Sequence, residues 1–282
     1  MKRILIPTDF SDNSWNAIVY AFNIFENTPC EFHIVNAYDL AATQLLTTIS
    51  TQKIGEQYKL LRSASQKGLD MVVEDIENSK TSMLHSFKTI SRLGELVEVL
   101  QSLLKENHYD LVLMATKGAT EAKEIFMGSN AHKVVQYLDS CPVLVIPEEC
   151  RYQEISNIAF ATNFERMYFK SEINPIKDLA KIHDATIRMI QVYEEPKLSE
   201  MQSFNSSTLE HYFSNRKHDF HVIEDFSTIE NAIQAFIEEL EIDVLAMINY
   251  PHGFIKRLLR EPVIKKITFH TVIPFLVIPA DN

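Results

Sequence analysis

Short apolar runs alternate with longer amphipathic segments along the first half of this chain. The apolar runs are short enough to form strands buried on both faces of a sheet, and they cover residues 3–8, 31–38, 83–90, 111–115 and 143–146. Between them, hydrophobic residues recur at helical spacing within residues 11–25, 41–84, 95–106 and 129–138. Strands that alternate with helices predict an α/β domain with a mostly parallel sheet and right-handed crossovers.

The chain then repeats this pattern. NIAFATNF at residues 157–164 repeats RILIPTDF at residues 3–10, at an offset of 154 residues, whereas IPFLVIP at 273–279 repeats CPVLVIP at 141–147 at an offset of 132. The second copy is therefore 22 residues shorter between these landmarks (154 minus 132). We expect most of the loss in its second helical region.

The duplication predicts two domains, at residues 1–150 and 151–282, joined by a short charged linker near residues 148–154. A length of 282 residues agrees with two domains of ordinary size. Two helix starts are also marked by capping residues. Ser11 is suited to cap the first helix, and STIE at 227–230 is a capping box ahead of a strand predicted at 243–248.

The segment at residues 110–147 has the local order of a phosphate cradle. A buried strand at 111–115 leads into Lys117 and Gly118, and after nine further residues Gly128 and Ser129 precede a helix. Glycine lets the backbone approach an anion closely, and the first N–H groups of a helix lack partners within the helix. Anion binding is one interpretation of this arrangement.

The spacing Gly118, nine residues, then Gly128-Ser129 resembles the back half of the nucleotide motif of the universal stress protein family, G-x2-G-x9-G-[S/T]. That motif usually lies within a phrase like MGTHG and ahead of a PVLVV strand; this chain has MATKG at 114–118 and PVLVI at 142–146. The first motif glycine is replaced by Ala115. The resemblance extends over nearly the whole chain. It implies two Rossmann-like (adenine nucleotide alpha hydrolase-like) domains, each an open, mostly parallel five-stranded sheet flanked by helices.

The resemblance also implies a ligand and a site in the first domain. In the family, the segment that matches PTD contacts the nucleoside, the end of the second strand contacts the base, and the glycine loop holds the phosphates. The implied ligand is ATP or another adenine nucleotide, accompanied by Mg²⁺. The corresponding positions here are Pro7, Thr8, Asp9, Ala37, Ala115, Lys117, Gly118, Gly128, Ser129 and Asn130.

Structural interpretations of the same residues stay open. Asp9 precedes a predicted helix and can simply accept backbone N–H groups there. Gly118 can form a tight turn, Gly128 can permit close packing of helix on sheet, and Ser129 can be an N-cap. The methyl group of Ala115 is either tolerated after a small shift or excludes a triphosphate.

The second copy departs further from the motif. Asn163 replaces Asp9 and Ala161 replaces Pro7, while the place of Gly128-Ser129 falls around REP at 260–262. Because the close backbone approach and the hydroxyl are lost, and Glu261 repels phosphate, we predict no nucleotide binding by the family mode in this domain. A local basic cluster at 256–260 is interpreted as a solvated helix face.

The composition of the chain argues against several classes of protein. A formal net charge of −11 opposes non-specific binding to nucleic acid or to anionic membranes. No apolar run reaches the length of about 18 residues that a membrane span needs, and the N-terminus enters a strand without a signal-peptide core. Three cysteines without metal-ligand spacing indicate buried thiols in a reducing compartment, so we expect a cytoplasmic protein.

Two functions remain in competition. The first is a universal stress protein-like regulator of the stress response that binds ATP or a related nucleotide in domain 1 only. The alternative is a protein-interaction module that has kept the fold while its nucleotide sites decayed. The scattered histidines and the absence of hydrolase or P-loop motifs favour a non-enzymatic protein with at most slow ATP hydrolysis. The resemblance further implies an internal pseudo-dimer through strands 143–146 and 275–278, a possible homodimer, and an unidentified protein partner.

Overall fold

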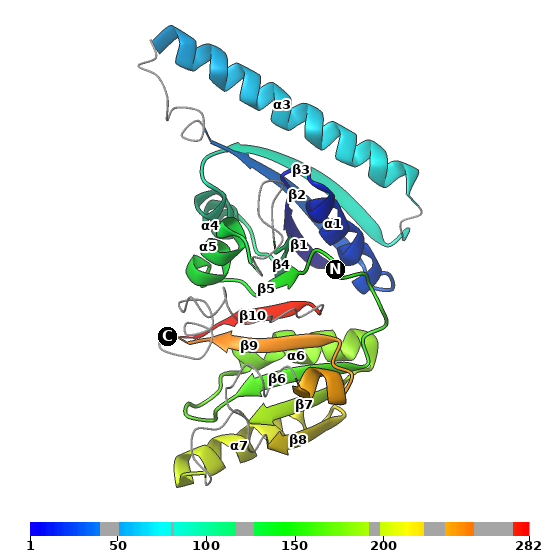
Figure 1. The fold of residues 1–282 in the computed structure, drawn as a ribbon, viewed down its shortest axis with the longest axis vertical. Coiled ribbons are helices and arrows are strands. Elements are labelled where there is room, and N and C mark those ends of the chain that lie inside the picture. Colours follow the sequence, from blue (N-terminus) through cyan, green and yellow to red (C-terminus); the bar gives the residue numbers. More distant parts are fainter. Residues whose placement is uncertain are drawn as a thin grey trace. The chain divides into compact units, whose positions relative to one another are not determined.

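The computed structural model describes residues 1–39, 51–79, 82–116, 127–191, 198–222, 235–250 and 273–281. These residues form two compact units, divided between Val143 and Leu144. Each unit is an open parallel sheet flanked by helices, so the predicted fold class is confirmed (Figure 1).

The first unit alternates strands and helices in chain order. Its elements are β1 (Lys2–Pro7), α1 (Asp12–Ile24), β2 (Cys30–Tyr38), α3 (Thr51–Asn78), β3 (His85–Leu93), α4 (Leu96–Glu106), β4 (Leu111–Ala115) and α5 (Ser129–Tyr137). Strand β5 (Val143–Ile146) follows, and only its first residue belongs to this unit. The strands lie in the order β3-β2-β1-β4, and the pairs between them are parallel. Just before β5, the carbonyl of Pro142 accepts from the Val112 N–H at 2.9 Å, which places the start of β5 beside β4.

The two faces of this sheet are covered differently. On one face Phe22 of α1 packs edge-on against Phe32 and Phe87, with ring centroids 5.2 and 5.1 Å apart. The long helix α3 buries one stripe, formed by Ser65, Leu69, Val72 and Ile76. On the other face α4 buries Val99, Leu100 and Leu103, as its predicted apolar face requires.

The helix and strand boundaries follow local chemistry. Ser11 caps α1 as predicted, since its Oγ accepts from the Ser14 N–H at 3.2 Å. The third strand begins at His85, two residues later than predicted, and continues to Leu93. Met83 and Leu84 supplied the apolar signal but are exposed, because β3 is an edge strand of mixed polarity rather than a buried apolar run.

The second unit repeats the first with a shorter middle. Its elements are β6 (Asn157–Thr162), α6 (Lys170–His183), β7 (Thr186–Gln191), α7 (Glu200–Phe213), β8 (His218–Val222), β9 (Val244–Asn249) and β10 (Phe275–Pro279). The strand order is β10-β9-β6-β7-β8, again with parallel pairs. Helix α7 has 14 residues where α3 has 28, so the second helical region carries most of the shortening, as expected. The capping box at 227–230, the REP segment at 260–262 and the basic cluster at 256–260 lie outside the described residues.

The duplication extends to individual hydrogen bonds. The Asp110 carboxylate accepts from the Arg3 N–H at 2.7 Å, and its own N–H donates to the Arg3 carbonyl at 2.9 Å. Asp243 makes the same pair of bonds with Asn157, at 2.8 and 2.9 Å. In each unit an aspartate therefore fixes the start of the strand that precedes the first helix.

Two composition-based expectations also meet the structure. All three cysteines are buried, and no disulfide links them. Among the helices of the described residues, none combines the length and apolar character needed to cross a membrane.

Candidate functional site

The strand order of the first unit places a topological switch point between β1 and β4. Strand β1 pairs with β2 on one side and with β4 on the other. The connection after β1 leads through α1 to β2, whereas the connection after β4 leads through α5 to β5 on the opposite side, so the chain leaves β1 and β4 in opposite directions. Open α/β sheets bind ligands at such a switch point, beyond the carboxyl ends of the strands. Pro7 and Ala115, the last residues of β1 and β4, therefore lie at the predicted edge.

The turn after β1 is fixed by a buried polar network. Thr8 is buried, and its Oγ1 accepts from the Phe10 N–H at 3.1 Å and lies 2.9 Å from Ser14 Oγ. The side-chain amide of Asn36, also buried, donates to the Thr8 carbonyl at 2.8 Å. The Thr8 hydroxyl thus serves the turn itself. Asn36 was not among the predicted site residues, although a polar residue within the apolar run IVNAY was a signal for it.

Asp9 is exposed at the tip of this turn. Its Oδ1 accepts from the Ser11 N–H at 3.1 Å and from the Ser11 hydroxyl at 2.5 Å. This is the helix-preceding role that the sequence left open. It also orients the carboxylate at the carboxyl edge of β1, since two bonds from one residue hold the same oxygen.

Ala37 lies on the same edge, one strand away. Pro7 of β1 pairs with Val35 of β2, and the Thr8 N–H donates to the Val35 carbonyl at 2.9 Å. Asp9 and Ala37 each lie two residues beyond this pair along the chain. Ala37 is half-buried, in the penultimate position of β2. Four of the predicted positions therefore line the ends of β1 and β2, with Pro7 and Thr8 enclosed and Asp9 the most exposed.

The start of α5 is held against the end of β4. The Gly128 N–H donates to the Thr116 carbonyl at 2.7 Å, so Gly128 lies beside the residue that follows Ala115. Both Ala115 and Thr116 are buried. Lys117 and Gly118 lie outside the described residues, and their predicted role stays a prediction.

Gly128, rather than Ser129, is the N-cap of α5. It has φ −69° and ψ 166°, and its carbonyl accepts from the His132 N–H at 2.8 Å. The alternative in which Ser129 is the N-cap is therefore wrong. Ser129 and Asn130 are the first helical residues and are exposed. The N-terminal end of α5, which carries partial positive charge, thus lies beside the end of β4.

The corresponding edge of the second unit has an equivalent turn, but other side chains pack beside it. Thr162 Oγ1 accepts from the Phe164 N–H at 3.4 Å and lies 2.5 Å from the hydroxyl of Tyr168, which stands where the first unit has Ser14. Tyr168 is buried, and burial raises the pKa of its hydroxyl. A buried tyrosine therefore stands at the position of the smaller, also buried, Ser14 of the first unit.

The second unit also has a buried carboxylate in its first helix. Glu172 of α6 accepts from the N–H groups of Phe169 and Asp281, at 2.8 and 3.0 Å. Burial raises the pKa of Glu172, although the two N–H groups act in the opposite direction. These contacts explain Glu172 as a structural group that joins the start of α6 to the segment after β10.

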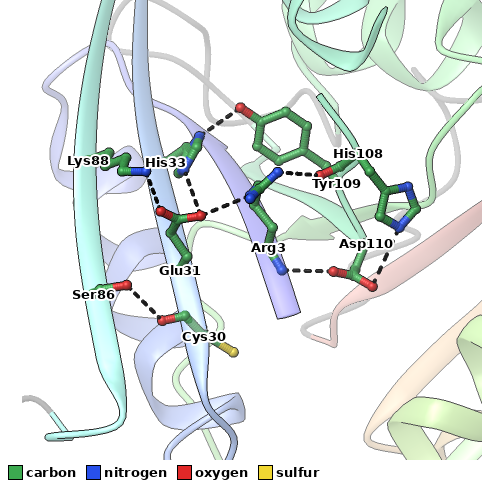
Figure 2. A network of polar contacts seen from close by, with 9 residues as sticks. All are labelled: Arg3, Cys30, Glu31, His33, Ser86, Lys88, His108, Tyr109 and Asp110. Atoms are coloured by element: carbon green, nitrogen blue, oxygen red, sulfur yellow. Dashed lines mark hydrogen bonds and ion pairs between the residues drawn. The ribbon is translucent and has the colours of Figure 1, made fainter. Parts of the chain in front are cut away.

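A second polar cluster lies toward the amino ends of the strands, at the other end of the first sheet. Figure 2 shows side chains of β1, β2 and β3 converging on Glu31, whose side chain is 9% exposed. Its oxygens lie 2.9 Å from Arg3 Nε, 2.5 Å from Lys88 Nζ and 3.3 Å from His33 Nε2. The hydrogen bond from Lys88 is the main cause that lowers the pKa of Glu31 to about 2.

His33 extends this cluster into the core. Its Nδ1 lies 2.7 Å from the Tyr109 hydroxyl, and burial lowers the pKa of the imidazole. The cluster is distant along the strands from the turn at Asp9, and it ties three strands together through one carboxylate. Elsewhere, no group of three or more histidine, cysteine or acidic side chains suited to hold a metal ion occurs within the described part of the chain.

The fold and the strand-end geometry agree with the outcome of comparison with known protein families. The model of the universal stress protein family matches residues 1–147. The chain belongs to the universal stress protein family. Two curated relatives match about half of this chain each: universal stress protein MJ0531 of Methanocaldococcus jannaschii, 30% identical over 149 residues and 81% of its own length, and YxiE of Bacillus subtilis, 24% identical over 147 residues and 98% of its length.

Solved structures extend the similarity of fold to the whole chain. A universal stress protein from Archaeoglobus fulgidus is 18% identical with a TM-score of 0.67, and the match covers 98% of this chain and 97% of that one. A structure described as a universal stress protein from Pseudomonas aeruginosa is 12% identical with a TM-score of 0.57, over 99% and 93% of the two chains. At these identities the likeness concerns the fold alone.

Proposed function

We propose that this universal stress protein binds ATP or a related adenine nucleotide at the carboxyl edge of its first unit and acts as a regulator in the stress response. The observation that carries the proposal is the 2.7 Å bond from the Gly128 N–H to the Thr116 carbonyl. This bond brings the N-terminal end of α5 to the end of β4, beside the turn that carries Asp9. A helix N-terminus and a glycine backbone are suited to hold phosphates, with Mg²⁺ accompanying a triphosphate.

The base and ribose would lie toward β2. Asp9 presents an oriented carboxylate that can accept hydrogen bonds from ribose hydroxyls or from an amino group, and Ala37 leaves room at the end of the neighbouring strand. In this proposal the second unit does not bind nucleotide in the same way. The Tyr168 ring is buried behind the corresponding turn, and Asn163 stands in place of Asp9.

The test is the nucleotide content of gently purified protein, released by denaturation and identified by chromatography. We expect close to one adenine nucleotide per chain, or, after its removal, saturable binding of added ATP in titration calorimetry. Asp9→Ala should weaken this binding, whereas Asn163→Ala changes the matched position in the second unit and should leave it intact. Protein that carries no nucleotide and shows no binding in large excess of ATP would contradict the proposal.

A protein-interaction module without nucleotide is the second candidate, and one observation favours it. Ala115 replaces the first glycine of the family motif and is buried at the end of β4. Its methyl group is therefore enclosed at a position where the motif glycine has no side chain. The two functions differ in one result. If an interaction module is correct, a protein partner captured from lysate will bind Asp9→Ala and wild-type protein with the same affinity, and neither will bind ATP.

A further inference from the structure

Phe10, directly after Asp9, has an unusual backbone and an exposed ring. Its φ is 65°, in the left-handed region that residues with a side chain seldom adopt, and its N–H donates to Thr8 Oγ1. The residue is 41% exposed. Such backbone outliers persist where surrounding structure holds them, and they concentrate at ligand-binding sites. Phe10 therefore combines a strained backbone with an exposed aromatic ring.

One side of the Phe10 ring rests on α3 at Gly68. A Cβ atom built at position 68 would lie 2.5 Å from Phe10 Cζ, 2.6 Å from Cε2 and 2.8 Å from Cε1. These distances are far below van der Waals contact, so the ring can occupy this place only because residue 68 has no side chain. Gly68 thereby sets where the ring lies, although it is remote in sequence from the turn.

The second unit shows that the turn itself does not require an exposed ring. Phe164, at the equivalent place, also has a left-handed backbone with φ 55°, yet it is fully buried. Its ring packs against Phe220 with centroids 5.5 Å apart, and Asn205 of α7 donates to its carbonyl at 2.8 Å. In the first unit the same turn instead presents an aromatic surface beside an exposed carboxylate.

We propose that Phe10, seated on Gly68, is the surface on which the base of the nucleotide stacks. This inference rests on the proposed function, because it assigns a residue to the base end of that site. Asp9 and Ala37 each lie two residues beyond the Pro7–Val35 pair at this edge, and Phe10 follows Asp9 immediately. Stacking of a planar base on an aromatic ring is favourable for every base, so Phe10 would contribute affinity and placement, while polar groups select among bases.

The experiment is titration calorimetry of ATP and of inorganic tripolyphosphate with five proteins: wild type, Phe10→Ala, Phe10→Leu, Gly68→Ala and the double variant Phe10→Ala/Gly68→Ala. Loss of one base–aromatic stack should weaken ATP binding by about 5- to 150-fold in Phe10→Ala. Tripolyphosphate, which has no base, should bind wild type and Phe10→Ala equally. Phe10→Leu keeps apolar bulk without a flat ring and should remain weaker than wild type.

Gly68→Ala tests the support of the ring without altering any ligand contact. The new methyl group displaces the Phe10 ring, so ATP binding should weaken in the wild-type background. In the Phe10→Ala background no ring is left to displace, and the same change should have no further effect. Additive losses would show that Gly68 acts independently of Phe10 and would overturn the inference.

The remaining outcomes separate this inference from the proposed function. If wild type binds ATP and Phe10→Ala or Phe10→Leu binds it equally well, the stacking role is wrong while nucleotide binding stands. If wild type binds no adenine nucleotide, both are wrong. Thermal unfolding of each variant verifies folding, which an exposed side chain at position 10 should hardly affect.

Discussion

Phe10 and Phe164 share a left-handed backbone at the same turn of the two units, but Phe10 is 41% exposed and Phe164 is fully buried. The duplicated turn has kept its hydrogen bond from the phenylalanine N–H to a threonine hydroxyl in both places. The two turns differ in how deeply the phenylalanine ring is buried. In the first unit the ring stays exposed beside Asp9, whereas in the second unit the ring packs against Phe220.

The two turns are supported by two different asparagines, which allows a matched comparison. Asn36 donates to the Thr8 carbonyl and Asn205 to the Phe164 carbonyl, each at 2.8 Å, and both side chains are buried. We expect Asn36→Ala and Asn205→Ala each to lower the free energy of unfolding by about 1–3 kcal/mol, because a buried carbonyl loses its partner.

Only one of these variants should affect the ligand. Asn36→Ala loosens the turn that carries Asp9, so it should also weaken ATP binding, while Asn205→Ala should leave ATP binding unchanged. Chemical denaturation and calorimetry on the same samples measure both effects. Equal ATP affinities in the two variants would separate the Asn36 hydrogen bond from the site.

Ala115→Gly restores the first glycine of the family motif. If the buried methyl group narrows the site, its removal should tighten ATP binding. It should also destabilise β4 by roughly 0.5–1 kcal/mol, because glycine loses more backbone freedom on folding than alanine. Calorimetry at a temperature where both proteins are folded compares the affinities. Weaker binding in Ala115→Gly would mean that the methyl group packs usefully beside the site.

The sequence predicted most of the first sheet because its central strands are rich in apolar residues. The structure has three of the predicted strands, β1, β2 and β4, within one or two residues of their predicted bounds, and Ser11 is the N-cap of α1 as predicted. The edge strand β3 was displaced, since exposed positions carry no apolar pattern. The duplication could be recognised in the sequence because strand segments of the two halves, such as RILIPTDF and NIAFATNF, are still similar.

The residues of the candidate site could be proposed from the sequence only where a short motif includes them. Asp9, Ala115 and Gly128 follow from the motif, but the roles of Asn36 and Gly68 depend on contacts between residues far apart in the chain. A glycine in the middle of α3 predicts a weakened helix, and nothing local indicates that a phenylalanine ring lies on it. Likewise, the burial of Phe164 and the exposure of Phe10 depend on the residues that pack over two equivalent turns, such as Phe220 over Phe164.

The cysteines should react slowly in the folded protein. Burial raises the pKa of Cys30 to about 11 and those of Cys141 and Cys150 to about 12, so little reactive thiolate is present near pH 8. We expect a thiol reagent to modify the native protein slowly and all three cysteines rapidly in denaturant. Rapid modification of any one of them in native protein would show local opening at that residue.

Acid stability should depend on the Glu31 cluster. The folded-state pKa of Glu31, about 2, lies below its ordinary value of 4.5, and that of His33 is also lowered from 6.5. In both cases the unfolded chain binds more protons as the pH falls. The contribution of His33 to the free energy of unfolding is therefore complete above pH 6.5 and is lost below it, and that of Glu31 is complete above 4.5 and is lost toward pH 2.

Two variants separate these contributions. Glu31→Gln removes the carboxylate that Arg3 and Lys88 contact, so it should lower stability at neutral pH and reduce the slope of stability against pH below 4.5. His33→Gln should reduce the slope below pH 6.5. His108→Gln, which changes a side chain that is 86% exposed, serves as the control for the replacement of a histidine by glutamine. Denaturation curves at a series of pH values provide the measurement. A wild-type stability that stays constant between pH 7 and 3 would contradict this account, because neither group would then bind protons differently in the folded and unfolded states.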